Sequence, residues 1–345
     1  MVDTSLGARR GQRGGLLLSL FMSLLVVAGA LAGAAAWWLN QPLPLAQASA
    51  EVSIEAGTPV REIVRLWREA GVQAQPELLY QWFRWSGQAR RIKAGSYEIE
   101  RGATPRSLLD KMVKGEEPLE TVRFIEGWTL RQVRAALAAA PHLKPLSAGL
   151  GEAELMTALG APGEAAEGHF FPDTYAYSRG VSDLTVLKRA HAAMRRQLDA
   201  AWALRQADSP LPTPEAALIL ASVVEKETGR AADRGKVAGV FTNRLRLGMP
   251  LQSDPTVIYG LGSDYDGRLR KVDLIRDTPY NSYTRNGLPP TPIALPGRDS
   301  LRAVMQPDPT KALYFVARGD GSSAFSETLS EHNQAVNQYI RGPRK

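Results

Sequence analysis

The sequence of 345 residues contains no cysteine and only four histidines. The absence of cysteine excludes disulfide bonds, thiolate nucleophiles and cysteine-ligated zinc sites, and it is compatible with export to an oxidising compartment. The histidines are widely separated, and none forms an HExxH or similar pair: His142, His169, His191 and His332. The sequence therefore predicts no metal site.

A strong excess of one charge is also missing. The chain has 42 Lys and Arg against 35 Asp and Glu, which gives a net charge of +7 and a pI near 9.6. A basic protein suits nucleic acid, anionic lipid or an acidic wall polymer, but these basic residues are scattered and no DNA- or RNA-binding signature is present. We therefore expect no nucleic-acid partner. With 44% hydrophobic and 22% charged residues, the chain is expected to fold.

One long uncharged apolar run extends from Leu16 to Trp38. About 23 residues at roughly 1.5 Å each span a hydrocarbon layer of roughly 30 Å, so the run predicts one transmembrane helix over residues 16–38. Three arginines precede the run, and no Lys or Arg follows it until Arg61. The positive-inside rule therefore places residues 1–15 in the cytoplasm and the rest of the chain outside.

The alternative to an anchor is a cleaved signal peptide, because the small residues at 28–36 offer cleavage positions. The apolar part of a signal peptide is only about 7 to 15 residues long, which favours the anchor. After the run, Pro42 and Pro44 restrict the backbone, so residues 39–50 are predicted to form an extended, semi-rigid linker.

The most informative segment is 216–262, which reads AALILASVVEKETGRAADRGKVAGVFTNRLRLGMPLQSDPTVIYGLG. It contains most of a helix that is predicted to start at Pro214, with Thr213 as its N-cap, and to be ended by Gly229, which puts Glu227 in its last turn. The helix is apolar on nearly every face, so Glu225 and Glu227 emerge where a core meets a surface or a cleft. The two acids lie about 200° apart around the helix and cannot both face one cleft, and periodicity does not choose between them.

Several motifs occur in one order along the chain: EKET, FTNRLRLGM, LQSDPTVIYG, YNSYTRNGLPPTPIALPG and ALYFVARGDGSSAFSETLSEHN. This order resembles the YceG-like (MltG) endolytic murein transglycosylases of bacteria, and the likeness extends weakly back to about residue 51. The resemblance implies a lyase that cleaves the MurNAc-GlcNAc bond of nascent peptidoglycan strands internally and ends their elongation. It also implies no cofactor, a bacterial inner-membrane location with a periplasmic body, and peptidoglycan synthases as partners.

The resemblance selects Glu227 as the catalytic residue, because the functional glutamate of the family is the second acid of the E-K-E step. A glycosidic bond breaks when an acid protonates the leaving oxygen as an oxocarbenium-like centre develops. An apolar surround and the carbonyl-rich end of a helix both favour the protonated form of Glu227. In a lytic transglycosylase the same carboxylate then acts as base on the muramyl 6-hydroxyl and closes a 1,6-anhydro ring.

Six further residues are expected to bind the glycan, because amides, carboxylates and aromatic rings suit hydroxyl, N-acetyl and ring-face recognition. They are Asn243, Gln252, Asp254, Tyr280, Asn281 and Tyr283. Asp254 alternatively serves as a turn or capping residue before Pro255, and the two tyrosines alternatively fill a core. Phe170 and Phe171, in the family-like segment EGHFFPDTY, are expected in a core rather than against a sugar.

The expected fold class is α+β. Residues 51–118 show short elements in the order β-α-α-β-α, which resembles the LysM-like subdomain that the family places after its anchor. LysM modules bind GlcNAc-containing glycans, and packing or spacing is the alternative role. Residues 119–345 are expected to form a mixed α+β catalytic domain. Within it, residues 312–317 read as a buried strand that pairs as a hairpin with residues 325–328.

Two other functions stay open from the residues alone. The first is a non-catalytic peptidoglycan-binding scaffold in which both glutamates are structural. The second is a hydrolytic muramidase that uses water and a second carboxylate, for which Asp254, Asp273 and Asp277 are available.

Overall fold

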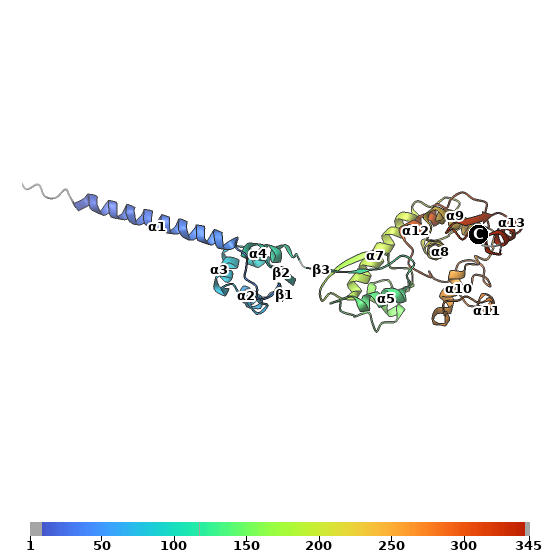
Figure 1. Ribbon diagram of the computed structural model, residues 1–345, viewed down its shortest axis with the longest axis horizontal. Coiled ribbons are helices and arrows are strands. Elements are labelled where there is room, and N and C mark those ends of the chain that lie inside the picture. Colours follow the sequence, from blue (N-terminus) through green and yellow to red (C-terminus); the bar gives the residue numbers. More distant parts are fainter. Residues whose placement is uncertain (1–8, 117, 342–345) are drawn as a thin grey trace, which may run out of the picture. The chain divides into compact units, whose positions relative to one another are not determined.

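The computed structural model describes residues 9–116 and 118–341 (Figure 1). The chain divides into two compact units, residues 1–119 and residues 120–345. Helices contain more residues than strands in both units, and the strands of the described ranges pair two by two, as β1 with β2, β3 with β4 and β5 with β6. The predicted α+β fold class is confirmed.

Helix α1 (Arg9–Leu39) contains the predicted transmembrane run. Its part Leu18–Leu39 is long and apolar enough to cross a membrane, and large side chains along it are exposed, such as Leu20 and Val26. A signal sequence near the N-terminus meets the same criteria of length and composition. The helix is therefore compatible with a membrane anchor.

The rest of unit 1 has the expected β-α-α-β-α order. Its elements are β1 (Ser49–Ile54), α2 (Val60–Glu69), α3 (Pro76–Trp85), the short 3-10 helix η1 (Ala89–Arg91), β2 (Gly95–Glu100) and α4 (Pro105–Lys114). Strands β1 and β2 are antiparallel, with Ser49 opposite Glu100. The helices bury Trp67 and Phe83 in a core that also contains Tyr97 of β2.

The predicted linker needs a correction. Residues 39–50 are extended in part, but they belong to unit 1 rather than standing apart from it. Leu39 and Leu43 are buried, the Leu43 amide donates to the carbonyl of Ala103 at 2.7 Å, and the Pro44 carbonyl accepts from Gln73 at 2.8 Å. The apolar side chains of Leu39 and Leu43 join the core of unit 1, which the two prolines alone do not reveal.

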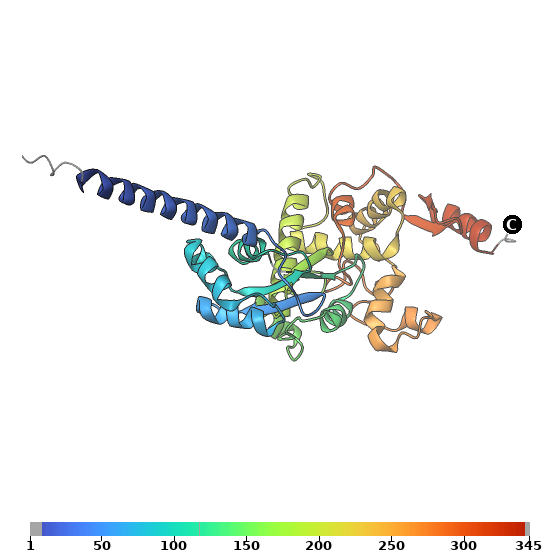
Figure 2. The same ribbon diagram turned by 60° about the vertical axis from the view of Figure 1, so that its left-hand side comes forward.

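Unit 2 contains the remaining elements. They are β3 (Leu119–Arg123), α5 (Leu130–Ala139), α6 (Glu152–Leu159), β4 (Thr174–Ser178), α7 (Asp183–Trp202), α8 (Pro214–Glu227), α9 (Ala231–Arg246), α10 (Asp254–Leu261), η2 (Gly262–Asp264), α11 (Lys271–Ile275), α12 (Arg298–Met305), β5 (Tyr314–Ala317), β6 (Ser323–Ser326), α13 (Leu329–Val336) and the π-helical turn η3 (Asn337–Arg341). In both views, α10 with α11 and β5–β6 with α13 extend from the group formed by α8, α9 and α12 (Figures 1 and 2).

Helix α8 is the centre of unit 2. The Thr213 hydroxyl accepts from the Ala216 amide at 3.1 Å, so the predicted cap and helix bounds are confirmed. Every residue from Ala216 to Val224 is buried, and the helix packs against α7, α9, α10 and α12. The one polar residue of this run, Ser222, accepts from the Ile293 amide at 2.9 Å. This bond fastens the proline-rich loop before α12 to the helix.

Two further expectations concern unit 2. Phe170 and Phe171 are buried, which confirms the core interpretation. Strands β5 and β6 form the expected hairpin, with Tyr314 opposite Ser326 and Ala317 opposite Ser323. The expectation that the first strand is buried was wrong, because all four residues of β5 are at least partly exposed. The hairpin therefore presents side chains to solvent, next to the end of α8.

Candidate active site

Glu225 and Glu227 point to different parts of unit 2, as their spacing predicts. Glu225 accepts from the Gly297 amide at 2.9 Å and from the Ser300 hydroxyl at 2.7 Å, at the N-terminus of α12. Glu227 instead accepts from the Ser253 hydroxyl at 2.8 Å. The structure thereby supplies what periodicity could not, because Glu225 is engaged in stabilising a helix terminus.

Glu227 has the electrostatic surroundings of an acid. Burial of its carboxyl disfavours the charged form and raises the pKa of Glu227 to about 7, and the negative charge of Asp254 acts in the same direction. The hydrogen bond from Ser253 and the positive charge of Arg244 oppose this rise. A large fraction of Glu227 is therefore protonated near neutral pH, where an ordinary glutamate is ionised.

Two hollows meet at Glu227. One has a volume of about 300 Å³ and is lined by Glu227, Gln252, Asp254, Tyr283, Tyr314 and His332, among others. The other has a volume of about 640 Å³ and lies between the segment after α8, at Thr228–Arg230, and the hairpin turn at Asp320–Ser323. The carboxyl thus lies where a polymer has space on either side of it. We call the two hollows together the catalytic cleft.

Three of the predicted substrate-binding residues line this cleft. Tyr283 donates from its hydroxyl to Asp254 at 2.6 Å, so these two side chains act as a pair at the start of α10. Gln252 accepts from the Arg244 guanidinium at 3.1 Å and has a left-handed backbone with φ of 52°. A non-glycine residue rarely adopts this conformation, and such positions gather at functional sites.

The other three predicted residues do not line the catalytic cleft. Asn243 donates its amide to the carbonyls of Thr310 and Ala312, at 2.8 and 3.2 Å. Asn281 is completely buried and donates to three backbone carbonyls of the α11 region. Tyr280 bonds Thr291 through its hydroxyl and lines a separate pocket. These contacts give the two asparagines structural roles, in positioning the segment before β5 and the loop after α11.

Sequence reasoning missed three residues that line the cleft, Arg244, Tyr314 and His332, and also Ser253, which bonds Glu227. Ser253 lies between two residues that were selected, and its position in the QSD motif was the available signal. Arg244 is buried, donates to the carbonyls of Pro250, Leu251 and Leu313, and lies 5.1 Å from the Tyr314 ring centroid. Tyr314 in turn stacks on His332, with ring centroids 5.2 Å apart. Nothing local marks these last two residues, because they reach the cleft only through the fold.

In the described ranges, no three His, Cys, Asp or Glu side chains gather in a way that could hold a metal ion. The cleft itself offers amides, hydroxyls, aromatic rings and a protonated carboxyl. Groups of this kind suit a neutral, hydroxyl-rich substrate and acid–base chemistry.

Comparison with known proteins identifies the family. A sequence model of the YceG-like family matches residues 52–338. The chain belongs to the YceG-like family. An endolytic murein transglycosylase of Bacillus subtilis (strain 168) is 30% identical over 306 residues, which cover 84% of each chain.

More distant relatives agree with this membership. An endolytic murein transglycosylase of Streptococcus pneumoniae (strain R6) is 27% identical over 322 residues, which cover 84% of this chain and 58% of the streptococcal protein. The chain thus spans little more than half the length of that relative. A crystallised yceG-like protein of Listeria monocytogenes is 27% identical with a TM-score of 0.51, over 83% of this chain and 98% of its own.

Proposed function

We propose that this YceG-like protein is an endolytic lytic transglycosylase that cleaves the MurNAc-GlcNAc bond of nascent peptidoglycan strands. The observation that carries the proposal is the carboxyl of Glu227, with a pKa raised to about 7 and placed where the two hollows of the cleft meet. Space on both sides of the acid allows a strand to continue in both directions, which internal cleavage requires. The endolytic murein transglycosylases similar to this chain support the same reaction.

In the proposed mechanism, protonated Glu227 donates its proton to the glycosidic oxygen as the bond breaks. The resulting carboxylate accepts a hydrogen bond from Ser253 and stabilises positive charge developing on the sugar. Glu227 then removes the proton of the muramyl 6-hydroxyl, whose oxygen attacks the anomeric carbon and closes the 1,6-anhydro ring. No water enters the product, and Glu227 returns to its protonated state.

Asp254, Tyr283 and Gln252 are proposed to hold the sugar next to the acid, together with the ring of Tyr314. A hydrolase would need a second carboxylate near the bond. Of the three aspartates named above as possible second carboxylates, only Asp254 lines the cleft, and Asp320 of the hairpin turn lines it as well. Asp277 is paired with Arg285 at 2.8 Å, and Asp273 accepts from the Arg270 amide at the start of α11.

Location follows from the same reading. We propose that α1 is an uncleaved single-pass anchor in the bacterial inner membrane, with residues 1–15 in the cytoplasm and both folded units in the periplasm. The part of this assignment that concerns residues 1–8 lies outside the described residues. We further propose that residues 51–118 are LysM-like, and that cleavage ends strand elongation beside peptidoglycan synthases.

The test uses the full chain in detergent and uncrosslinked glycan polymer in heavy-oxygen water. The products should end in 1,6-anhydro-N-acetylmuramic acid, should be one water lighter than reducing ends and should carry no heavy oxygen. Reducing ends that carry heavy oxygen from the solvent would show that the protein is a muramidase and not a lyase. Binding of glycan without turnover would indicate the scaffold.

Substitution of the two glutamates separates catalysis from structure. Glu227→Gln keeps the size of the side chain but cannot donate a proton at neutral pH, so turnover should fall by about 10² or more. Glu225→Gln is the matched control, because it lies two residues away and weakens only the contacts at the start of α12. It should cost about 1 kcal/mol of stability and little turnover. A dominant loss at Glu225 would contradict the assignment.

A further inference from the structure

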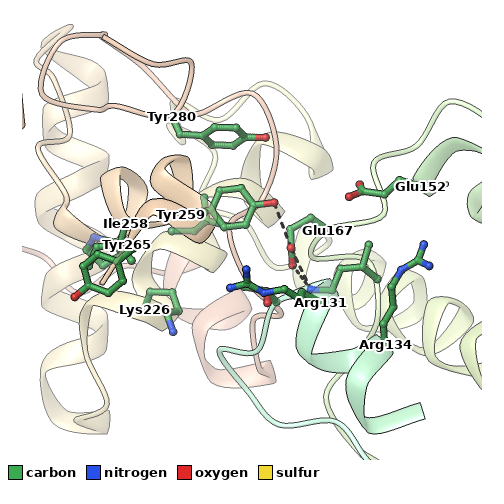
Figure 3. A pocket seen from close by; sticks show the side chains of 14 residues that line it. Arg131, Arg134, Glu152, Glu167, Lys226, Ile258, Tyr259, Tyr265 and Tyr280 are labelled. Atoms are coloured by element: carbon green, nitrogen blue, oxygen red, sulfur yellow. Dashed lines mark hydrogen bonds between the residues drawn. The ribbon is translucent and has the colours of Figure 1, made fainter. Parts of the chain in front are cut away.

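The largest pocket described in unit 2 is not the catalytic cleft. It has a volume of about 750 Å³ and lies between the N-terminus of α5, the end of α8 and one face of α10 (Figure 3). Its position is close to the cleft in the chain, because Lys226 and Pro255 line it while their neighbours Glu227 and Asp254 line the cleft. The end of α8 and the start of α10 thus contribute to both. We call it the α5–α10 pocket.

Positive charge exceeds negative charge around the α5–α10 pocket. Its cations are Arg131, Arg134 and Lys226, and its acids are Glu152 and Glu167. Arg131 is exposed, and no acid of the described ranges forms an ion pair with it. Lys226 is also exposed and donates to the backbone carbonyl of Gly127, so its charge is not neutralised by that contact.

The two acids of the pocket differ in availability. Glu167 is buried and accepts from the Leu130 amide at 3.0 and 3.1 Å and from the Tyr259 hydroxyl at 3.2 Å, as Figure 3 shows. It therefore stabilises the start of α5 and the wall of the pocket. Glu152 is exposed at the rim. Removal of Glu152 would leave the pocket more positive.

The rest of the pocket wall is apolar and aromatic. Tyr259 and Tyr280 meet edge to face with ring centroids 4.8 Å apart, and Ile258, Tyr265 and Ile293 extend this wall. A ligand that fits both sides carries carboxylates together with small apolar groups. While the lactyl carboxyl of MurNAc is in amide linkage to a stem peptide, the glycan backbone is neutral and gives no reason for three cations. The stem peptides combine free carboxylates with alanine methyl groups.

We propose that the α5–α10 pocket binds the carboxylate-bearing stem peptide of a muramyl residue at or next to the cleaved bond. The proposal rests on the proposed function, because it takes peptidoglycan to be the substrate. Arg131 and Lys226 pair with peptide carboxylates, and the tyrosine wall contacts the alanine side chains. Strands that retain their peptides are then preferred over strands from which the peptides have been removed.

Binding is measured by calorimetry on the full-length chain in detergent, in the Glu227→Gln background so that nothing is cleaved. The two probes are the disaccharide GlcNAc-MurNAc carrying the tetrapeptide L-Ala-γ-D-Glu-meso-diaminopimelate-D-Ala, and the same disaccharide without peptide, with its lactyl carboxyl capped as the neutral methylamide. The peptide-bearing probe should bind about tenfold or more tightly, since charge-assisted pairs are among the stronger hydrogen bonds. Arg131→Glu should remove most of that difference.

Two further variants serve as a control and as a test in the opposite direction. Arg123→Glu changes the same type of charge on β3, where Arg123 is exposed and outside the pocket, so it should leave both affinities unchanged. Glu152→Gln should tighten binding of the peptide-bearing probe by a few-fold, because it removes a repulsive carboxylate. Both variants keep the residues that hold the pocket together, and thermal unfolding checks that the fold persists.

Equal affinity for the two probes would overturn the proposal, and so would equal effects of Arg131→Glu and Arg123→Glu. Weaker binding after Glu152→Gln would overturn the electrostatic account. Failure of the proposed function has a different readout, because it is a lack of turnover of glycan polymer by the unsubstituted chain. Peptide-dependent binding without turnover would support the proposed role of the pocket and contradict only the proposed lyase activity.

Discussion

Ser253 has a direct influence on the proton of Glu227. Its hydroxyl donates to the carboxyl at 2.8 Å, and this bond stabilises the charged form and lowers the pKa of Glu227. In the Ser253→Ala variant the pKa should therefore rise further. Since the free enzyme needs the protonated acid, kcat/KM should decline above about pH 7 in the unsubstituted chain, and at higher pH in the variant.

The measurement is kcat/KM on glycan polymer from about pH 5 to 9 for both proteins. If kcat/KM of the variant declines at the same pH as that of the unsubstituted chain, or at a lower pH, Ser253 does not lower the pKa of Glu227. Unchanged thermal unfolding at low pH would show that the variant is folded.

Glu167 and Glu227 also affect stability. Burial raises the pKa of each to about 7, while the unfolded chain has ordinary glutamates near 4.5. Between these values the unfolded state binds fewer protons than the folded state, so the free energy of unfolding falls as pH rises through this window. After allowance for solvent screening, we expect each residue to cost about 1–2 kcal/mol at pH 8 relative to pH 4.

Thermal unfolding of the Glu227→Gln variant tests this expectation. Glutamine carries no charge at either pH, so the variant should lose less stability than the unsubstituted chain between pH 4 and 8. A steeper loss of stability in the variant would mean that the ionised form of Glu227 stabilises the fold more than the protonated form does.

At the scale of elements, Asn243 connects the end of α9 to the segment that leads into β5. Its amide donates to Thr310 and Ala312, and the hairpin that follows supplies Tyr314 to the cleft. Asn243→Ala leaves two partly buried carbonyls without this donor and should lower the free energy of unfolding by about 1–3 kcal/mol. The KM should rise as well, because one wall of the cleft is displaced.

Chemical denaturation and steady-state kinetics measure the two effects of Asn243→Ala. Asn243→Asp keeps the shape but lacks the amide donor, so it should behave similarly. Leu247→Ala is the control, since Leu247 lies at the end of α9 and its side chain is exposed. A raised KM with unchanged stability would favour direct contact between Asn243 and the glycan.

The elements that sequence reasoning predicted are those with local signals. Helix α8 has a capping threonine, a proline in its first turn and an apolar body, and both of its ends were predicted. The glutamate pair could be placed at its end, but the choice between the two needed the partners of Glu225 on α12. Those partners lie more than 70 residues away in the chain, and their positions depend on how the helices pack.

The cleft shows the same limit at its other wall. Residues around Gln252 and Asp254 stand close to Glu227 in sequence and were selected, whereas Tyr314 and His332 were missed. Asn281 was selected for its chemistry, but its amide is directed into the backbone of its own loop. Residue type indicates what a side chain is able to do, and the fold determines whether it faces the substrate.

At the scale of the whole molecule, truncated chains test which residues near the end of α1 the folded part of unit 1 needs. Deletion of residues 1–40 is expected from the sequence alone to give a soluble, folded body. Leu39 and Leu43 lie in the core of unit 1, however, and Trp38 packs against it. Deletion of residues 1–36 should therefore preserve thermal stability, and deletion of residues 1–46 should reduce it by several kcal/mol.

Thermal unfolding of the two truncated chains, followed by near-ultraviolet dichroism of the tryptophans, measures the difference. Equal stability would mean that the packing of Leu43 contributes little.

The full chain should stay with membranes in high salt, because salt weakens only electrostatic binding. Release by salt, or a mature N-terminus near Trp37, would contradict the anchor.

The packed end of α1 has a consequence for how this enzyme finds its substrate. If α1 is the membrane anchor proposed above, the burial of Leu39 and Leu43 in unit 1 means that folding, and not the length of a flexible linker, sets the distance of that unit from the bilayer. A unit at a fixed distance from the bilayer moves only parallel to the membrane. Its encounters with strands still attached to lipid are then governed by lateral diffusion and by the number of strands per unit of membrane surface, rather than by the bulk concentration of glycan.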